Sequence, residues 1–132
     1  MYRLVLSDLD GTLLNHEKQL SERTIQTVDK LIKKGIRFVP ATGRLDVMAK
    51  PYLKAMKGTD IVIGCDGALV RNRKTGETLY ENTLPADVCR RVFEICRTYG
   101  LSYYIFTKDC LVGDDRKNDR LRIHQKFNQT VE

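Results

Sequence analysis

The sequence predicts an α/β fold with a doubly wound parallel sheet, and two observations on its first half carry that prediction. Short runs of consecutive apolar residues, too short for helices, are typical of strands covered on both faces. They lie at 4–6 and 61–63, and a further short strand, interrupted by Arg37, is expected at 36–39; stretches of helical period at 21–35 and 45–56 separate the three. A strand, helix, strand succession crosses over right-handed, so the strands should be parallel.

Local signals support the two helices. Ser21 can cap the first helix, and Gly35 fits its C-terminal end. Pro51 should start or kink a turn in the second helical stretch, because proline lacks an N–H donor. The inward positions of the first helix follow the helical period and are Ile25, Val28, Leu31 and Ile32.

The pattern changes after the third strand. Residues 68–80 alternate on either side of Lys74-Thr75-Gly76, which predicts a hairpin. Pro85 introduces a helix that should end at Gly100, and the β-rich stretch 101–113 follows. A second structural unit therefore begins near the end of the hairpin.

The composition of the chain narrows the range of partners and locations that we expect for it. The chain has 132 residues and a formal charge of +6, but its lysines and arginines are scattered without a dense basic run, so we expect no nucleic-acid partner. Charged helix faces explain most of this charge, and a positive field that attracts phosphorylated substrates is the functional alternative. No apolar stretch approaches the roughly 20 residues that cross a bilayer, and the N-terminus lacks signal-peptide segments. We expect a cytoplasmic protein without a membrane partner.

The four cysteines do not indicate a metal site. They contain no C-x-x-C pair, and neither histidine lies near them at zinc-ligand spacing. Reduced, structural thiols are the expectation.

Two aspartates mark the end of the first strand in LVLSDLDGTLLN, residues 4–15. Ligands of a parallel α/β sheet bind outside the carboxyl ends of its strands, where Asp8 and Asp10 emerge. Carboxylates at i and i+2 of an extended segment share a side and can face one magnesium ion and one phosphate. Gly11 permits the tight turn that follows. The alternative is that both aspartates serve only turn and helix capping.

The next two strands deliver further polar groups to the same edge. Thr42 and Gly43 bring a hydroxyl, a permissive glycine and backbone N–H groups entering a helix, which together make a phosphate seat. Thr42 also suits a simple helix N-cap. The third strand delivers residues 65–68, Cys-Asp-Gly-Ala.

In these motifs the chain resembles the haloacid dehalogenase-like (HAD) superfamily of phosphohydrolases, specifically its Cof-like branch with a class IIB α/β cap. The matching segments are D-L-D-G-T-L-L at 8–14, A-T-G-R at 41–44, D-G-A-L-V at 66–70 and the hairpin with T-G-E-T-L-Y. The resemblance implies an incomplete HAD-like core at 1–82 and a partial cap at 83–132.

The resemblance also implies a chemistry. Asp8 would attack phosphorus and form an aspartyl-phosphate, and Asp10 would act as acid and then base, helped by a pKa raised toward neutrality. Magnesium would be held by Asp8 and the backbone carbonyl of Asp10. Thr42, with Gly43 and Gly11, would hold the phosphate of a small phosphorylated metabolite.

The chain departs from the family pattern at several positions. Asp66 stands where this branch usually has asparagine, and an anion beside a phosphate weakens binding unless it is neutralised or turned away. The family also needs a lysine and a late G-D-x-x-N-D segment, and residues 113–119 match that segment only with altered spacing or without its glycine. We interpret 113–119 as a solvated cap turn, with a catalytic acidic loop as the alternative, and expect the chain to end within the cap.

Enzymatic activity therefore stays open at the level of sequence. The rival hypothesis is a truncated, catalytically incompetent HAD-like fragment that acts as a binding or regulatory module. Unpaired sheet edges and apolar surface in such a fragment favour a homodimer. A phospho-acceptor receiver domain is a weaker alternative, because its aspartate should directly end the third strand and Asp66 follows a Gly-Cys spacer.

Overall fold

The computed structural model describes residues 2–107 and 110–113. The chain forms two compact units, Met1–Glu81 and Asn82–Glu132. The assignment of the two units as a core portion and a partial cap stays a prediction.

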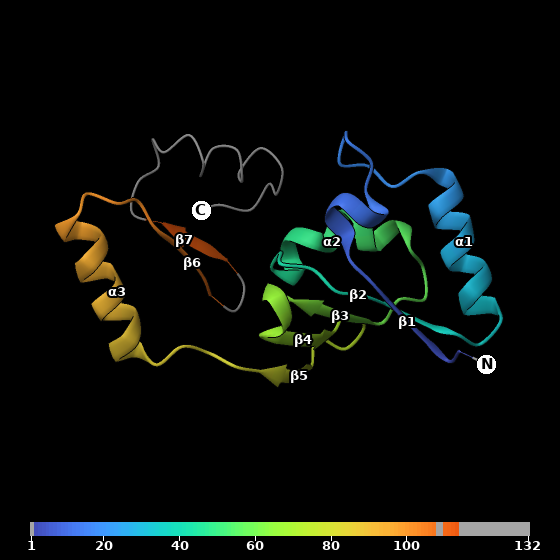
Figure 1. The fold of residues 1–132 in the computed structure, drawn as a ribbon. Helices are drawn as coiled ribbons and strands as arrows, with labels where there is room; N and C mark the ends of the chain where they lie inside the picture. Colours follow the sequence, from blue (N-terminus) through green and yellow to red (C-terminus); the bar gives the residue numbers. More distant parts are fainter. Residues whose placement is uncertain (1, 108–109, 114–132) are drawn as a thin grey trace. The chain divides into compact units, whose positions relative to one another are not determined.

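The first unit alternates strands and helices before it ends in a hairpin (Figure 1). This order confirms the three strands, two helices and hairpin predicted from the sequence. Its elements are β1 (Leu4–Ser7), α1 (Glu22–Lys33), β2 (Arg37–Pro40), α2 (Asp46–Ala55), β3 (Ile61–Gly64), β4 (Leu69–Asn72) and β5 (Thr78–Glu81).

The strands follow the predicted parallel arrangement. β1 pairs with β2 in parallel, with Val5 opposite Phe38. β2 continues into a parallel bridge between Ala41 and Ile63, which joins it to β3. β4 and β5 extend the sheet as an antiparallel hairpin. The carboxyl ends of β1, β2 and β3 consequently lie along one edge.

The predicted N-cap and C-terminal end of α1 are confirmed, whereas the effect predicted for Pro51 in α2 is not. Ser21 Oγ accepts the backbone N–H of Thr24 at 3.1 Å and caps α1, and Gly35 follows that helix with φ +74°. α2, however, continues through Pro51 to Ala55, so no new turn starts at the proline. Burial of the α2 side chains offsets the hydrogen bond that Pro51 cannot donate.

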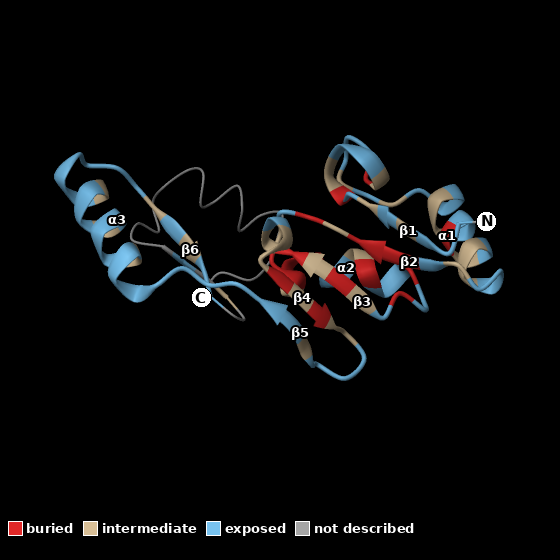
Figure 2. Ribbon diagram, turned by 60° about the horizontal axis from the view of Figure 1, so that its bottom comes forward, coloured by how far each residue is buried: buried red, intermediate tan, exposed pale blue. Residues whose placement is uncertain are grey.

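The hydrophobic core lies on the sheet face that α1 and α2 cover. Figure 2 shows buried residues along β2, β3, β4 and α2. Val5, Phe38 and Val62 point from the three parallel strands into this core. Its fully or nearly buried members are Leu9, Leu14, Val28, Phe38, Ala49, Leu53, Met56 and Val62. The core thus fixes the strands whose carboxyl ends carry the aspartate and threonine motifs.

The second unit contains the predicted helix and β-rich stretch. α3 (Ala86–Thr98) is followed by Gly100 with φ +62°, and β6 (Tyr104–Phe106) pairs antiparallel with β7 (Leu111–Gly113). Phe93 and Tyr103 stack with ring centroids 4.6 Å apart. Of the sequence segment 113–119, only Gly113 lies within the described residues. Within the described ranges, no helix is long and apolar enough to cross a membrane.

Candidate active site

The aspartate loop begins at the carboxyl end of β1. Leu9 is completely buried, and its carbonyl accepts the N–H of Leu14 at 2.9 Å, which closes a tight segment over Leu9–Leu13. Gly11 has φ +78° in this turn, a conformation that favours glycine. Asp8 is exposed, and its carboxylate makes no hydrogen bond or ion pair with any described residue. The loop therefore presents Asp8 for chemistry while Leu9 anchors it.

The Asp10 carboxylate is clamped by two cations. Arg44 donates from Nε to Oδ2 at 2.7 Å and from Nη2 to Oδ1 at 2.8 Å. Lys18 Nζ lies 2.7 Å from the same Oδ1. The hydrogen bond from Arg44, supported by Lys18, outweighs partial burial and lowers the pKa of Asp10 to about 2. The expectation of a pKa raised toward neutrality was wrong for this state, because charge-assisted hydrogen bonds favour the carboxylate.

The sequence analysis assigns no role to either partner of Asp10. Arg44 belongs to the A-T-G-R motif, and its place directly after the Thr-Gly pair indicates that it reaches the same edge. The guanidinium carbon also lies 5.1 Å from the Tyr52 ring centroid, so α2 helps to hold it. Lys18 reaches Asp10 because it lies at φ +58° in a turn stabilised by the Asn15 side chain. No short motif signals that approach.

The threonine loop lies beside this clamp. Thr42 is buried, its N–H donates to the Ile63 carbonyl at 2.9 Å, and its Oγ1 accepts the N–H of Arg44 at 3.2 Å. The Thr42 hydroxyl proton finds no acceptor among the described residues. It is therefore available to an oxygen of a ligand. A Cβ at Gly43 would lie 2.8 Å from Asp66 Oδ1, so a side chain at this position would have to displace the Asp66 carboxylate.

The third loop is tied to the threonine loop through its backbone. Asp66 N–H donates to the Thr42 carbonyl at 3.3 Å, and Cys65 N–H donates to the Arg44 carbonyl at 3.0 Å. Cys65 and Asp66 adopt φ +51° and +53°, which is uncommon for residues with side chains and is found at functional sites. Burial, followed by the charges of Asp46 and Asp66, raises the pKa of the Cys65 thiol. Cys65 is thus a poor nucleophile.

The structure joins the three strand-end loops in pairs. Asp10 meets Arg44, and Thr42 and Gly43 meet Asp66. Gly11 shapes the first turn, with open space where a side chain would be. The roles predicted for Asp8, Asp10, Gly11, Thr42 and Gly43 stay predictions, but their convergence at one sheet edge matches the reasoning from strand order.

Magnesium fits the oxygen donors of this edge in part. Within residues 2–107 and 110–113, no three His, Cys, Asp or Glu side chains converge as a metal centre. The Asp10 carboxylate is engaged by Arg44 and Lys18 and is unsuited as a ligand. The Asp8 carboxylate and the main-chain carbonyl of Asp10 are hard oxygen ligands of the kind Mg²⁺ uses alongside substrate oxygens.

The Asp10 clamp predicts a pH-dependent contribution to stability. The pKa of the Asp10 carboxyl group is 3.8 in the unfolded chain and about 2 in the folded chain. The group therefore stabilises the fold at pH values above 3.8, and this contribution is lost as the pH falls through 2. Since the group is partly exposed, we expect about 1 kcal/mol. The difference in unfolding free energy between wild type and Asp10→Asn, measured in urea, should shrink by that amount from pH 5 to pH 2. A pH-independent difference would contradict the clamp.

A parallel sheet whose carboxyl edge presents an exposed aspartate, a clamped aspartate and a buried threonine hydroxyl belongs to the class of α/β proteins whose ligands bind outside the carboxyl ends of the strands. Comparison with known families makes this specific. The model of the haloacid dehalogenase-like hydrolases matches residues 5–132. The chain belongs to this family, in the Cof-like branch, and its fold is the incomplete HAD-like α/β fold expected from the sequence.

Similar proteins are phosphatases by name. The chain is 35% identical over 109 residues to the HMP-PP phosphatase of Shigella flexneri, covering 83% of this chain and 40% of that protein. It is 31% identical over 99 residues to the 5-amino-6-(5-phospho-D-ribitylamino)uracil phosphatase of Bacillus subtilis, covering 74% and 37%. The chain thus spans less than half the length of these curated relatives.

A solved structure shows the same fold. A haloacid dehalogenase-like hydrolase from Bacteroides thetaiotaomicron superposes with a TM-score of 0.89 at 28% identity. The similarity covers 99% of this chain and 50% of that one. The order of strands and helices in the described residues is therefore that of a HAD-like protein.

Proposed function

We propose that this chain carries the nucleophile-bearing part of a magnesium-dependent phosphohydrolase that acts on small phosphorylated metabolites. The observation that carries the proposal is the ion pair between Asp10 and Arg44, because it joins the aspartate loop to the threonine loop at one sheet edge. Names of the relatives support a phosphorylated metabolite as substrate.

The first half-reaction uses the exposed carboxylate. An Asp8 oxygen attacks phosphorus, the bond from phosphorus to the ester oxygen breaks, and that oxygen leaves with its electron pair and takes a proton from Asp10. The Thr42 hydroxyl, with the backbone at Gly43 and Gly11, binds the phosphoryl oxygens. Bound through Asp8 and the Asp10 carbonyl, Mg²⁺ would offset the repulsion between nucleophile and substrate.

The second half-reaction releases phosphate. Water attacks the aspartyl-phosphate, gives its proton to the Asp10 carboxylate, and the acyl oxygen to phosphorus bond breaks to restore Asp8. Arg44 and Lys18 favour the ionised Asp10, which suits this base role. The preceding acid role requires Asp10 to take up a proton, and a substrate phosphate that competes for the Arg44 guanidinium would loosen the clamp.

A second candidate is a catalytically incompetent HAD-like fragment that acts as a binding or regulatory module. No described lysine lies in ion-pair contact with Asp8, and Lys18 is engaged by Asp10. The lysine and late acidic segment that the family resemblance implies would then have to come from elsewhere. The predicted homodimer and the cytoplasmic location belong to either candidate and stay predictions.

Hydrolysis of an aryl phosphate by the purified 132-residue chain separates the two candidates. We expect turnover with magnesium, and its loss when a chelator removes the metal. If the circular dichroism spectrum is the same with and without chelator, unfolding of the chain is excluded as the cause of the lost turnover. Absence of turnover at every magnesium concentration would reject the enzyme and favour the binding module.

A further inference from the structure

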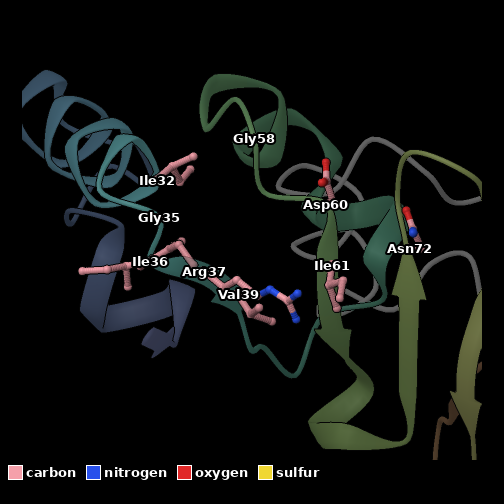
Figure 3. Close-up of a pocket in the computed structure, with 10 residues that line it drawn as sticks. Ile32, Gly35, Ile36, Arg37, Val39, Gly58, Asp60, Ile61 and Asn72 are labelled. Carbon is pink, nitrogen blue, oxygen red and sulfur yellow. The ribbon is translucent and has the colours of Figure 1, made fainter. Parts of the chain in front are cut away.

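The end of the sheet opposite the candidate active site carries a small depression. It has a volume of about 200 Å³ and lies between the carboxyl end of α2, the loop before β3 and the turn after β4. In Figure 3, Gly58 and Asp60 lie in that loop, and Asn72 lies at the end of β4, where the turn begins. We call this the basic depression, because the side chains that line it include Lys54, Lys57, Arg73 and Lys74.

Arg73 is the fixed element of the basic depression. Its Nη1 donates to the Leu53 carbonyl at 3.2 Å, to the Thr59 carbonyl at 2.9 Å and to Thr59 Oγ1 at 3.0 Å. All of these bonds use one nitrogen, so the N–H groups of Nε and Nη2 donate to no described residue. The planar guanidinium is therefore oriented in advance, with donors left for the oxygens of an anion.

The charges around the basic depression do not balance. Four of its lining side chains are cationic, and Asp60 is the one lining carboxylate among the described residues. The carboxyl end of α2 adds about half a negative charge, so an excess of about two to three positive charges remains. Burial also lowers the pKa of Arg73, although the charges of Asp60 and Asp46 oppose this shift. A concave site with such an excess attracts anions.

Neutralisation of the helix end is the simpler role for some of these cations. Lys54 lies in the last turn of α2, and Arg73 bonds to the Leu53 carbonyl, so these two are enough to offset the charge of the helix end. Lys57 and Lys74 lie beyond the helix, and neither makes an ion pair within the described part of the chain. Their charges remain available to a ligand.

The size of the basic depression limits its ligand. Pockets for whole drug-sized molecules measure roughly 300–1,000 Å³. A volume of about 200 Å³ therefore suits one compact group. A phosphate group offers oxygens both to the fork of an arginine and to the point charges of lysines. We propose that the basic depression binds a phosphate group, either free or carried by a small molecule, at a site separate from the candidate active site. This binding is independent of the catalytic roles assigned above.

Amide chemical shifts of the isotope-labelled 132-residue chain test the proposal site by site. The Gly58 amide reports the basic depression, and the Gly43 amide reports the candidate active site. Inorganic phosphate is titrated at a constant ionic strength set with chloride, because salt screens exposed charges. We expect the Gly58 amide to shift in a saturable manner.

Lysine variants connect this shift to the basic depression. Lys57→Gln should raise the Kd measured at Gly58 at least threefold, and its combination with Lys74→Gln at least tenfold, without changing any titration of Gly43. Lys50→Gln is the matched control, because Lys50 is exposed on α2 and does not line the depression. It should leave the titration of Gly58 unchanged.

A second titration identifies the source of the phosphate group. Phenylphosphonate is not hydrolysed to phosphate, so it represents a phosphate monoester. Tighter binding of phenylphosphonate at Gly58 supports the proposal with a phosphorylated small molecule as ligand, and equal or tighter binding of inorganic phosphate supports it with the free anion.

The proposal is overturned if the Gly58 amide does not titrate, if chloride alone causes the same shift, or if the Lys57 variants titrate like the wild type. A titration confined to Gly43 also overturns it, while leaving the proposed function intact. Loss of aryl phosphate turnover with a normal Gly58 titration would instead reject the proposed function alone.

Discussion

Replacement of Asp8 by asparagine is expected to reduce magnesium-dependent hydrolysis of an aryl phosphate about a thousandfold or more, because the amide oxygen cannot form the aspartyl-phosphate. Asp8 is exposed and its carboxylate has no described partner, so the unfolding free energy should change by less than about 0.5 kcal/mol. Loss of activity without loss of stability would identify the nucleophile rather than a structural role.

Asp60→Asn is the matched control for Asp8→Asn. Asp60 is also exposed and immediately precedes β3, at the end opposite the candidate active site, while its backbone carbonyl accepts the Arg73 N–H at 2.7 Å. The same change of charge at position 60 should leave turnover unaltered. Equal activity of Asp8→Asn and wild type would reject Asp8 as nucleophile, whatever the family of the chain.

The part of this site that could be predicted from sequence is the part fixed by topology. Consecutive apolar residues identify short strands of a parallel sheet, and the strand, helix, strand order sends their carboxyl ends to one edge. Asp8, Asp10 and Thr42 follow such strands directly, so their convergence required only the strand assignments. The cap at Ser21 and the helix end at Gly35 were likewise readable, because both depend on local backbone chemistry.

The ion pair and the pKa shift of Asp10 could not be predicted from the sequence in the same way. Asp10 and Arg44 are 34 residues apart, and whether their side chains meet depends on the turn at Gly11 and on Tyr52 holding the guanidinium. The direction of the Asp10 pKa follows from that contact. The family resemblance predicts the role of Asp10 in a complete site. The pKa of Asp10 in this chain depends instead on the side chains that contact it here, Arg44 and Lys18.

The structural role of a second carboxylate, that of Asp46, could not be predicted from the sequence. Asp46 looks like an ordinary acidic residue in the first turn of a helix, where it favours the helix dipole. Arg71 looks like a polar position in a hairpin. In the structure both side chains are only 9% exposed, and Arg71 Nη1 lies 3.0 Å from Asp46 Oδ2. This buried ion pair joins α2 to β4.

Replacement of Asp46 by alanine is expected to lower the unfolding free energy by about 3–5 kcal/mol, because it leaves the Arg71 charge buried without this carboxylate. Urea denaturation measures the change. Asp29→Ala is the control, since the Asp29 carboxylate lies 2.7 Å from Lys33 Nζ on the exposed side of α1 and should contribute less than about 0.5 kcal/mol. The double variant Asp46→Leu with Arg71→Met removes both charges and should recover most of the loss.

The effect of Asp46→Ala should extend to the candidate active site. Asp46 begins α2 two residues after Arg44, whose carbonyl accepts the Cys65 N–H and whose side chain clamps Asp10. Release of the helix start would therefore loosen the contact between the threonine loop and the aspartate loop. If the variant instead loses no more stability than Asp29→Ala, burial of the pair is not maintained in solution.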